Sequence, residues 1–169
     1  DLHAMLHRLV VRNYLLIDQL ELDLGEGLTV ITGETGSGKT IVIGALGLAM
    51  GDRADGNLFR DPSKRCVIEL EIEPATGASF LEEWCASNGV PLEDLLILRR
   101  QLEPGGRSRA FVNDTPVRLE QLRELGERMV HVHSQHHTLL LNTPAFQLGL
   151  LDHFIGHALK VKEYAERFA

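Results

Sequence analysis

The chain has 169 residues, about the size of one domain, and 44% of them are hydrophobic, which is enough to form a core. The formal net charge of −7 excludes a generally basic nucleic-acid-binding surface, so DNA contact would need a local patch or another part of the molecule. Two cysteines, Cys66 and Cys85, form no disulfide framework and favour a reducing, cytoplasmic compartment. No apolar run approaches the roughly 20 residues that span a bilayer, so no membrane contact is predicted.

The first elements are predicted from alternation and apolar runs. Residues 1–4, ahead of Met5, are expected to be extraneous to the fold. Strands are predicted at 6–12 and 17–24, the second because apolar and polar residues alternate strictly. The continuous apolar run at 28–32 predicts a buried central strand. Residues 41–50 are apolar nearly all round, which indicates a helix buried against a sheet and ended by Gly51.

The second half of the chain alternates strands with helices. The predicted elements are a strand at 66–73, a short helix at 77–88, a hairpin of strands at 95–102 and 108–113, a helix opened by Thr115-Pro116, and a short strand at 129–133. From residue 143 to 169 the apolar spacing is helical throughout. The fold class is therefore α/β with a substantial antiparallel part, organised as a lobe at 5–142 and a helical segment at 143–169.

Residues 33–40, Gly-Glu-Thr-Gly-Ser-Gly-Lys-Thr, match the phosphate-binding pattern G-x-x-x-x-G-K-[ST] at every fixed position. Glycines let the backbone fold so that its N–H groups point at phosphate oxygens, and the following helix adds its positive end. Lys39 would contact the β- and γ-phosphates, and Thr40 would bind Mg²⁺. The predicted nucleotide contacts are Gly33, Glu34, Thr35, Gly36, Ser37, Gly38, Lys39 and Thr40.

A hydrolytic site of this kind also needs an acidic residue at the end of a core strand. Two segments carry four apolar residues or glycine before an acid, ending at Asp18 and Asp152. Asp18 lies before the glycine loop at the start of a strand, and Asp152 lies within the predicted C-terminal helix. Both are interpreted as polar positions beside a core stripe, so the chain is predicted to bind a nucleotide without hydrolysing it alone.

Gln135 follows the predicted strand at 129–133, within a segment rich in histidine. A glutamine in this place can coordinate Mg²⁺ and orient the attacking water, but spacing alone leaves an ordinary polar loop residue equally open. The histidines at 131, 133, 136 and 137 have no cysteine or carboxylate nearby, which disfavours a zinc site.

Four segments resemble the N-terminal half of the ATPase head in the RecN family, bacterial DNA-repair proteins of the SMC-like class. They are residues 9–22, residues 33–40 together with 45–55, residues 107–117, and residues 131–137. The Gly-Asp-Arg-Ala-Asp run at 51–55 and the Arg-Ala-Phe-Val-Asn strand at 109–113 are more specific than the glycine loop, which many families share.

The resemblance implies the N-terminal lobe of an ABC-type ATPase head: a P-loop core sheet, an antiparallel subdomain and the root of a coiled-coil helix. It implies a catalytic and Mg²⁺-binding role for Gln135, beside Thr40, with ATP and Mg²⁺ as cofactors. The missing acids would lie on a C-terminal lobe of the same polypeptide, and ATP would pair two heads as a homodimer. DNA would be met by the full-length protein, in the cytoplasm and at the nucleoid, during double-strand break repair and recombination.

Three alternatives remain. In a transporter-type ABC domain the glutamine usually lies much nearer the glycine loop than Gln135 lies to Lys39. A P-loop kinase should show an arginine-rich lid and a base, and residues 140–169 show neither. The lobe alone could also act as a nucleotide-gated dimerisation module without enzymatic activity. Arg53 and Arg60 follow the loop helix and are either solvated or able to contact phosphate or a partner head.

Overall fold

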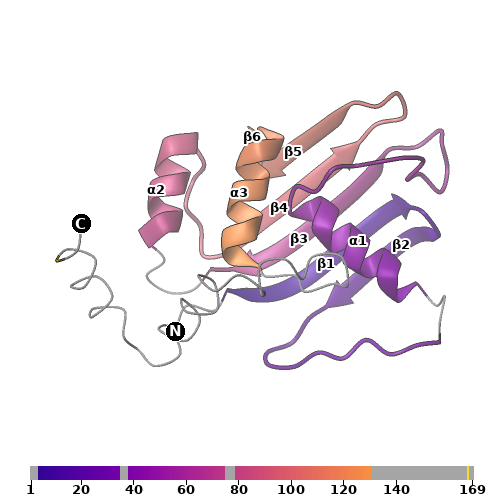
Figure 1. Ribbon diagram of the computed structural model, residues 1–169, viewed down its shortest axis with the longest axis horizontal. Helices are drawn as coiled ribbons and strands as arrows, with labels where there is room; N and C mark the ends of the chain where they lie inside the picture. Colours follow the sequence, from indigo (N-terminus) through magenta and orange to yellow (C-terminus); the bar gives the residue numbers. More distant parts are fainter. Residues whose placement is uncertain (1–3, 35–37, 75–78, 131–166, 168–169) are drawn as a thin grey trace. The chain divides into compact units, whose positions relative to one another are not determined.

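The computed structural model describes residues 4–34, 38–74, 79–130 and 167 (Figure 1). Two units divide the chain, residues 1–131 and 132–169, and the helices and strands below belong to the first unit. Apart from Arg167, the predicted helix at 143–169 lies outside the described residues. So do the predicted lobe boundary at 142 and residues His131, Val132 and His133 of the predicted short strand.

The described strands form one six-stranded antiparallel sheet in the order β2-β1-β3-β4-β5-β6. The strands are β1 (Met5–Tyr14), β2 (Ile17–Asp23), β3 (Cys66–Glu73), β4 (Leu96–Leu102), β5 (Ser108–Val112) and β6 (Thr115–Val117). The predicted strands at 6–12, 17–24 and 66–73 and the hairpin at 95–113 are thus confirmed. Positive φ angles at Gly105 and Gly106 form the hairpin turn.

Helices α1 (Lys39–Ala49) and α3 (Leu119–Met129) lie across one face of this sheet (Figure 1). Helix α1 packs against β1, β3 and β4, and α3 packs against β5. A third helix, α2 (Ser79–Asn88), joins β3 to β4 and is linked to α3 by a hydrogen bond from Gln121 to Asn88. The helices predicted at 41–50 and 77–88 are confirmed.

The helix-covered face of the sheet carries apolar rows that cross successive strands. One row consists of register partners, Leu22, Leu9, Leu70, Leu98 and Val112. Four of these five side chains, all except Leu22, are almost completely buried. At about 25 cal/mol per Å² of apolar surface, burial of such rows is the main stabilising contribution to the lobe. The sheet therefore supports α1, which begins at the glycine loop.

The opposite face is charged and held by ion pairs across strands. Arg99 lies 3.7 Å from Glu69 and over the ring of Phe111, 4.7 Å from its centroid. The guanidinium of Arg8 donates a hydrogen bond to the carboxylate of Glu21, and this ion pair raises the pKa of Arg8 and lowers the pKa of Glu21. Because strand residues alternate between faces, the same strands present a dry core on one side and these solvated pairs on the other.

Close glycine contacts set the distance between α1 and α3. Gly51, just after α1, has φ +101°, and a Cβ there would lie 2.7 Å from the backbone nitrogen of Arg123. A Cβ on Gly126 would lie 2.8 Å from the Cβ of Met50. Arg123 also donates a hydrogen bond of 3.1 Å to the carbonyl of Gly51. The prediction that Gly51 ends the helix is confirmed, and the structure adds that this glycine lets α3 approach.

Asn13 anchors the loop between α1 and β3 to the end of β1. Its side chain is 5% exposed, and its backbone has a φ of 55°. The amide nitrogen donates to the carbonyls of Asp61 and Lys64 at 3.0 and 2.8 Å, while the amide oxygen accepts from the Asp61 N–H at 2.7 Å. One buried side chain thus satisfies several loop groups that are remote in sequence.

One sequence prediction is wrong and two are wrong in part. Residues 28–32 form no strand, and Leu28, Val30 and Ile31 are 90%, 67% and 47% exposed, because no described strand pairs with this run. The helix predicted after Thr115-Pro116 is present as α3, but it begins at Leu119. Thr115-Pro116 itself lies in β6, at the edge of the described sheet, where a proline needs no hydrogen-bonding neighbour on its outer side. Met129, predicted to begin a strand, is the last residue of α3.

Candidate nucleotide-binding site

The glycine loop leads directly into the first turn of α1. Gly38 is the residue before the helix and has φ 91°, a conformation that favours glycine. Its carbonyl accepts hydrogen bonds from the N–H groups of Ile41 and Val42 at 3.0 and 3.1 Å. Gly38 has no side chain to cap the helix, and no acid stands in the first turn. The first N–H groups and the positive end of the helix are therefore suited to an anion from outside.

Lys39 folds back over the start of the loop. Its Nζ donates to the carbonyl of Glu34 at 2.7 Å and also to the carbonyl of Gly33. The ammonium is thereby held beside the helix N-terminus, where phosphate oxygens would replace carbonyl oxygens as acceptors. Charge-assisted bonds to phosphate are about twice as strong as bonds to neutral acceptors. The predicted role of Lys39 is thus compatible with its place.

Gly33, Glu34, Gly38, Lys39 and Thr40 are brought together, and they fit ATP with Mg²⁺. The side chain of Thr40 is exposed at the first turn of α1, so its hydroxyl is available to a metal ion. Bound Mg²⁺ would supply positive charge to the phosphates. The remaining loop residues predicted to contact nucleotide, Thr35, Gly36 and Ser37, lie outside the described residues.

Gln135 also lies outside the described residues, and so does the histidine cluster at 131–137. Within residues 4–34, 38–74 and 79–130 no group of three or more histidine, cysteine or acidic side chains could hold a metal ion. Asp18 is the second residue of β2 and is exposed, at the start of a strand as the sequence predicts, while Asp152 is not described. Because Asp18 lies at the start of a strand and not at its end, the structure supports the interpretation of this residue as an ordinary polar position.

The two arginines behind α1 differ in their contacts. Arg60 donates a hydrogen bond of 2.6 Å to the carbonyl of Leu16 and so ties the loop after α1 to the turn between β1 and β2. Arg53 is exposed. No sequence pattern indicated the Arg60 contact, because its partner is a main-chain carbonyl 44 residues away.

The two thiols play no part in this chemistry. Cys66 and Cys85 are free and buried, and burial raises the pKa of Cys66 to about 11 and also raises the pKa of Cys85. Both are therefore protonated and unreactive at neutral pH. No described helix has the length and apolar character needed to cross a membrane.

An apolar groove of about 1120 Å³ lies beside the glycine loop. It is lined by β1, by β2, by the segment that leads into the loop, and by α1, including Leu6, Leu22, Ile31, Ile43 and Leu46. Ile31 and Ile43 are each 47% exposed, and Leu28 and Val30 continue the exposed apolar run. An apolar surface of this extent next to a site is typical of a region that another segment covers.

Comparison with known proteins finds a matching family model and several relatives of the same name. The family model described as AAA domain matches residues 8–81. DNA repair protein RecN of Vibrio cholerae is 38% identical over 95% of this chain, and that of Haemophilus influenzae is 39% identical over 90%. RecN of Bacillus subtilis is 34% identical over 97% of the chain. The chain spans less than a third of the length of these relatives, 29%, 28% and 29% respectively.

Solved structures show the same fold at low sequence identity. A chain from work on ATP-driven dimerisation and DNA-stimulated activation of SMC ATPases matches 87% of this chain and 97% of its own length, with TM-score 0.59 and 17% identity. The SMC head domain from Thermotoga maritima matches 71% of this chain and 41% of its own, with TM-score 0.52 and 21% identity. The recombination mediator RecF with ATP matches 69% and 28%, with TM-score 0.52 and 15% identity.

A glycine loop at the head of a helix, packed on this antiparallel sheet, gives the chain the fold of a lobe of the SMC head domains. The relatives then give the particular family. Over at least 90% of its length the chain is similar to DNA repair protein RecN, in line with the family resemblance that its sequence indicated. These matches give no support to a transporter-type nucleotide-binding domain.

Proposed function

We propose that this chain is the ATP-binding lobe of an SMC-like ATPase that acts in DNA double-strand break repair and recombination. The observation that carries the proposal is the position of Lys39, whose ammonium is held against the loop carbonyls at the start of α1. Support for the repair role comes from relatives named DNA repair protein RecN. As a cytoplasmic, nucleoid-associated protein it would meet DNA through the full-length polypeptide.

ATP and Mg²⁺ are held in the ground state by groups of this chain. The loop N–H groups and Lys39 would bind phosphate oxygens, Thr40 would provide a hydroxyl ligand to Mg²⁺, and Gln135 would complete the metal contacts and orient water. Asp18 and Asp152 are not the catalytic acid in this proposal. Binding that is equally strong in the ground state and the transition state does not accelerate hydrolysis, so turnover requires acids from elsewhere.

The C-terminal lobe of the same polypeptide is the proposed source of those acids and the proposed cover of the apolar groove. The exposed run at 28–32 has the composition of a buried strand but no described strand beside it. A strand from the other lobe would satisfy its backbone groups and remove Leu28, Val30 and Ile31 from water. Two complete heads would then pair around ATP as a homodimer, with residues 143–169 leading into the coiled coil.

Equilibrium binding of Mg·ATP to this chain tests the proposal. Lys39→Ala should weaken binding roughly 30- to 1,000-fold. The estimate takes about 1.5–3 kcal/mol for each of two charge-assisted bonds and subtracts the two carbonyl bonds that the free lysine already makes, leaving about 2–4 kcal/mol. Lys64→Ala removes an exposed lysine outside the loop and is the matched control. Equal affinity of the Lys39→Ala variant and the unaltered chain would overturn the assignment of the site.

A further inference from the structure

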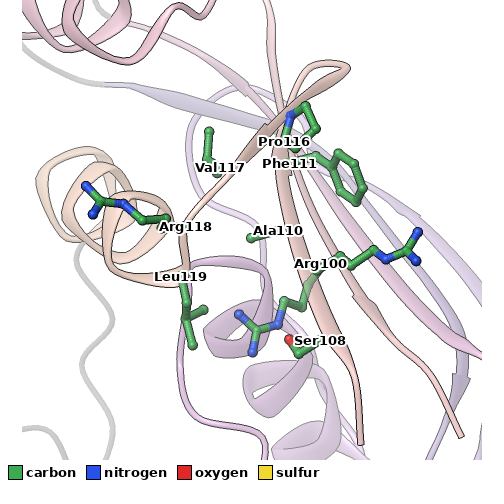
Figure 2. A pocket seen from close by; sticks show the side chains of 9 residues that line it. Arg100, Ser108, Ala110, Phe111, Pro116, Val117, Arg118 and Leu119 are labelled. Carbon is green, nitrogen blue, oxygen red and sulfur yellow. The ribbon is translucent and has the colours of Figure 1, made fainter. Parts of the chain in front are cut away.

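A second pocket of the described lobe lies away from the glycine loop. It has a volume of about 530 Å³, and none of residues 33–40 lines it. Its walls come from β4, β5, β6 and the start of α3: Arg100, Ser108, Arg109, Ala110, Phe111, Pro116, Val117, Arg118 and Leu119. Figure 2 shows Arg100 and Ser108 on the strand side and Arg118 and Leu119 on the helix side.

Arg100 occupies a core position of the sheet. Its register partners are Ile68 on β3 and Ala110 on β5, in a row that continues to Val11 and Val117. The other members of that row are apolar, so an arginine there stands where a leucine or isoleucine would be ordinary. Arg100 is only 2% exposed. Arginine is almost never buried to this degree unless its charge is paired.

Within the described residues, Arg100 has no such partner. Its Nε and Nη1 atoms are buried and have no hydrogen-bond acceptor, and no ion pair or aromatic ring contacts it. Its neighbour Arg99, on the other face of the same strand, is paired with Glu69 and stacked on Phe111. Burial and the positive charge of Arg123 lower the pKa of Arg100, so the surroundings of this guanidinium oppose its charge. A negatively charged ligand would remove that cost.

The other charges around the pocket have the same sign. Arg109 and Arg118 line it with Arg100, and no acidic residue does. Arg118 is the residue before α3, an 11-residue helix whose positive end therefore faces the pocket. Glu120 stands in the first turn of α3 but does not line the pocket. The buried guanidinium of Arg100, the exposed Arg118 and the helix N-terminus favour a ligand group with more than one negative charge, which is a phosphate rather than a carboxylate.

The remaining walls are apolar and fit an organic substituent. Ala110, Phe111, Pro116, Val117 and Leu119 form this part of the lining. The volume lies within the roughly 300–1,000 Å³ that small-molecule pockets usually have. We propose that this pocket binds a small phosphate monoester, with its phosphate group on Arg100 and at the N-terminus of α3. This site is separate from the ATP site and does not depend on the proposed function.

Calorimetric titration tests the assignment with glycerol 3-phosphate, inorganic phosphate and acetate as probes. The protein is the complete product of the gene carrying Lys39→Ala, which weakens phosphate binding at the glycine loop. Both phosphate probes should bind with one site per chain, and acetate should bind at least tenfold more weakly. Arg100→Gln should reduce the affinity for glycerol 3-phosphate at least tenfold, and Arg118→Gln, an exposed position, should reduce it several-fold. Arg12→Gln, at an exposed position on β1, which does not line the pocket, should change it less than twofold.

Thermal unfolding of each variant identifies any that fails to fold, and Arg118→Gln then still tests the site because its side chain is on the surface. Equal phosphate affinity in the Arg12, Arg100 and Arg118 variants would overturn the proposal. Absence of phosphate binding at millimolar concentration would overturn it as well. Acetate that binds as tightly as phosphate would show that Arg100 pairs with a carboxylate, such as an acidic side chain from the rest of the polypeptide, and would also refute a phosphate site.

Discussion

Replacing Gly51 by alanine should destabilise the lobe more than the same change at Gly56 or Gly126. Two costs act together at this position. Residues with a side chain rarely adopt a φ of +101°, and forcing alanine into this conformation should lower the stability by about 1–3 kcal/mol. The new Cβ would also lie 2.7 to 2.9 Å from backbone and side-chain atoms of Arg123. Helix α3 would have to move to relieve this clash, which should lower the stability by about a further 1–3 kcal/mol. The sum is about 2–6 kcal/mol, a large share of the roughly 5–15 kcal/mol that stabilises a domain.

Two further variants separate these costs. Gly56 has φ +76°, and a Cβ there would meet no atom within 4 Å, so Gly56→Ala should cost about 1–2 kcal/mol from the backbone alone. Gly126 has an ordinary helical backbone but would place its Cβ 2.8 Å from Met50. Gly126→Ala should therefore cost about 0–2 kcal/mol, because the gain in helix propensity of about 1 kcal/mol offsets part of the clash.

Urea unfolding followed by circular dichroism measures all three free energies of unfolding, and equal slopes are required for the comparison. The expected order of destabilisation is Gly51→Ala first, with the Gly56 and Gly126 variants well below it. A Gly51→Ala variant that is no less stable than Gly56→Ala would show that α3 does not press on this glycine. The close approach of α1 and α3 at Gly51 would then make no measurable contribution to the free energy of unfolding.

Two other predictions concern the loop that Asn13 anchors. Asn13→Asp should lower the free energy of unfolding by about 2–4 kcal/mol, because it replaces two donated hydrogen bonds by a carboxylate that faces the carbonyls of Asp61 and Lys64. The control Asn57→Asp, in the exposed loop, should change the free energy of unfolding by less than about 0.5 kcal/mol. Hydrogen bonds from Ser63, with Lys64 nearby, lower the pKa of Asp61 to about 2. Because the folded pKa is the lower one, this contribution to stability is complete above the unfolded value of about 3.9 and is lost as the pH falls toward 2. Carboxyl NMR titration should show that midpoint, and Ser63→Ala should raise it; an unchanged midpoint would refute the role of Ser63.

Sequence patterns predicted the antiparallel sheet well because its strands alternate. In β3 the alternation of apolar and acidic residues assigns each side chain to a face, and the structure buries Cys66, Ile68, Leu70 and Ile72 as that pattern requires. The same logic explains the failure at 28–32. An apolar run indicates that a segment is buried in its final setting, but it does not say which strands cover it. In the described lobe no strand does.

The glycine loop was predictable as a motif, while the pocket at Arg100 was not. The fixed spacing of Gly33, Gly38 and Lys39 follows from the shape of phosphate, so the motif can be recognised residue by residue. Arg100 follows Arg99 in the sequence, and nothing local distinguishes the two. Only the strand register shows that one is paired on the open face and the other is buried without a partner among the described residues. Asn13 is similar, since its loop partners lie some 50 residues away.

The central claim is that this chain binds Mg·ATP but does not hydrolyse it without the rest of the head. Phosphate release by residues 5–169 alone, and by the same residues joined to the C-terminal lobe through a shortened coiled coil, tests that claim most directly. We predict no turnover by the isolated chain, and turnover by the joined lobes that rises more than linearly with protein concentration as heads pair. Turnover by the isolated chain that Lys39→Ala abolishes would contradict the claim, and Asp152 would then be the first candidate for the catalytic acid.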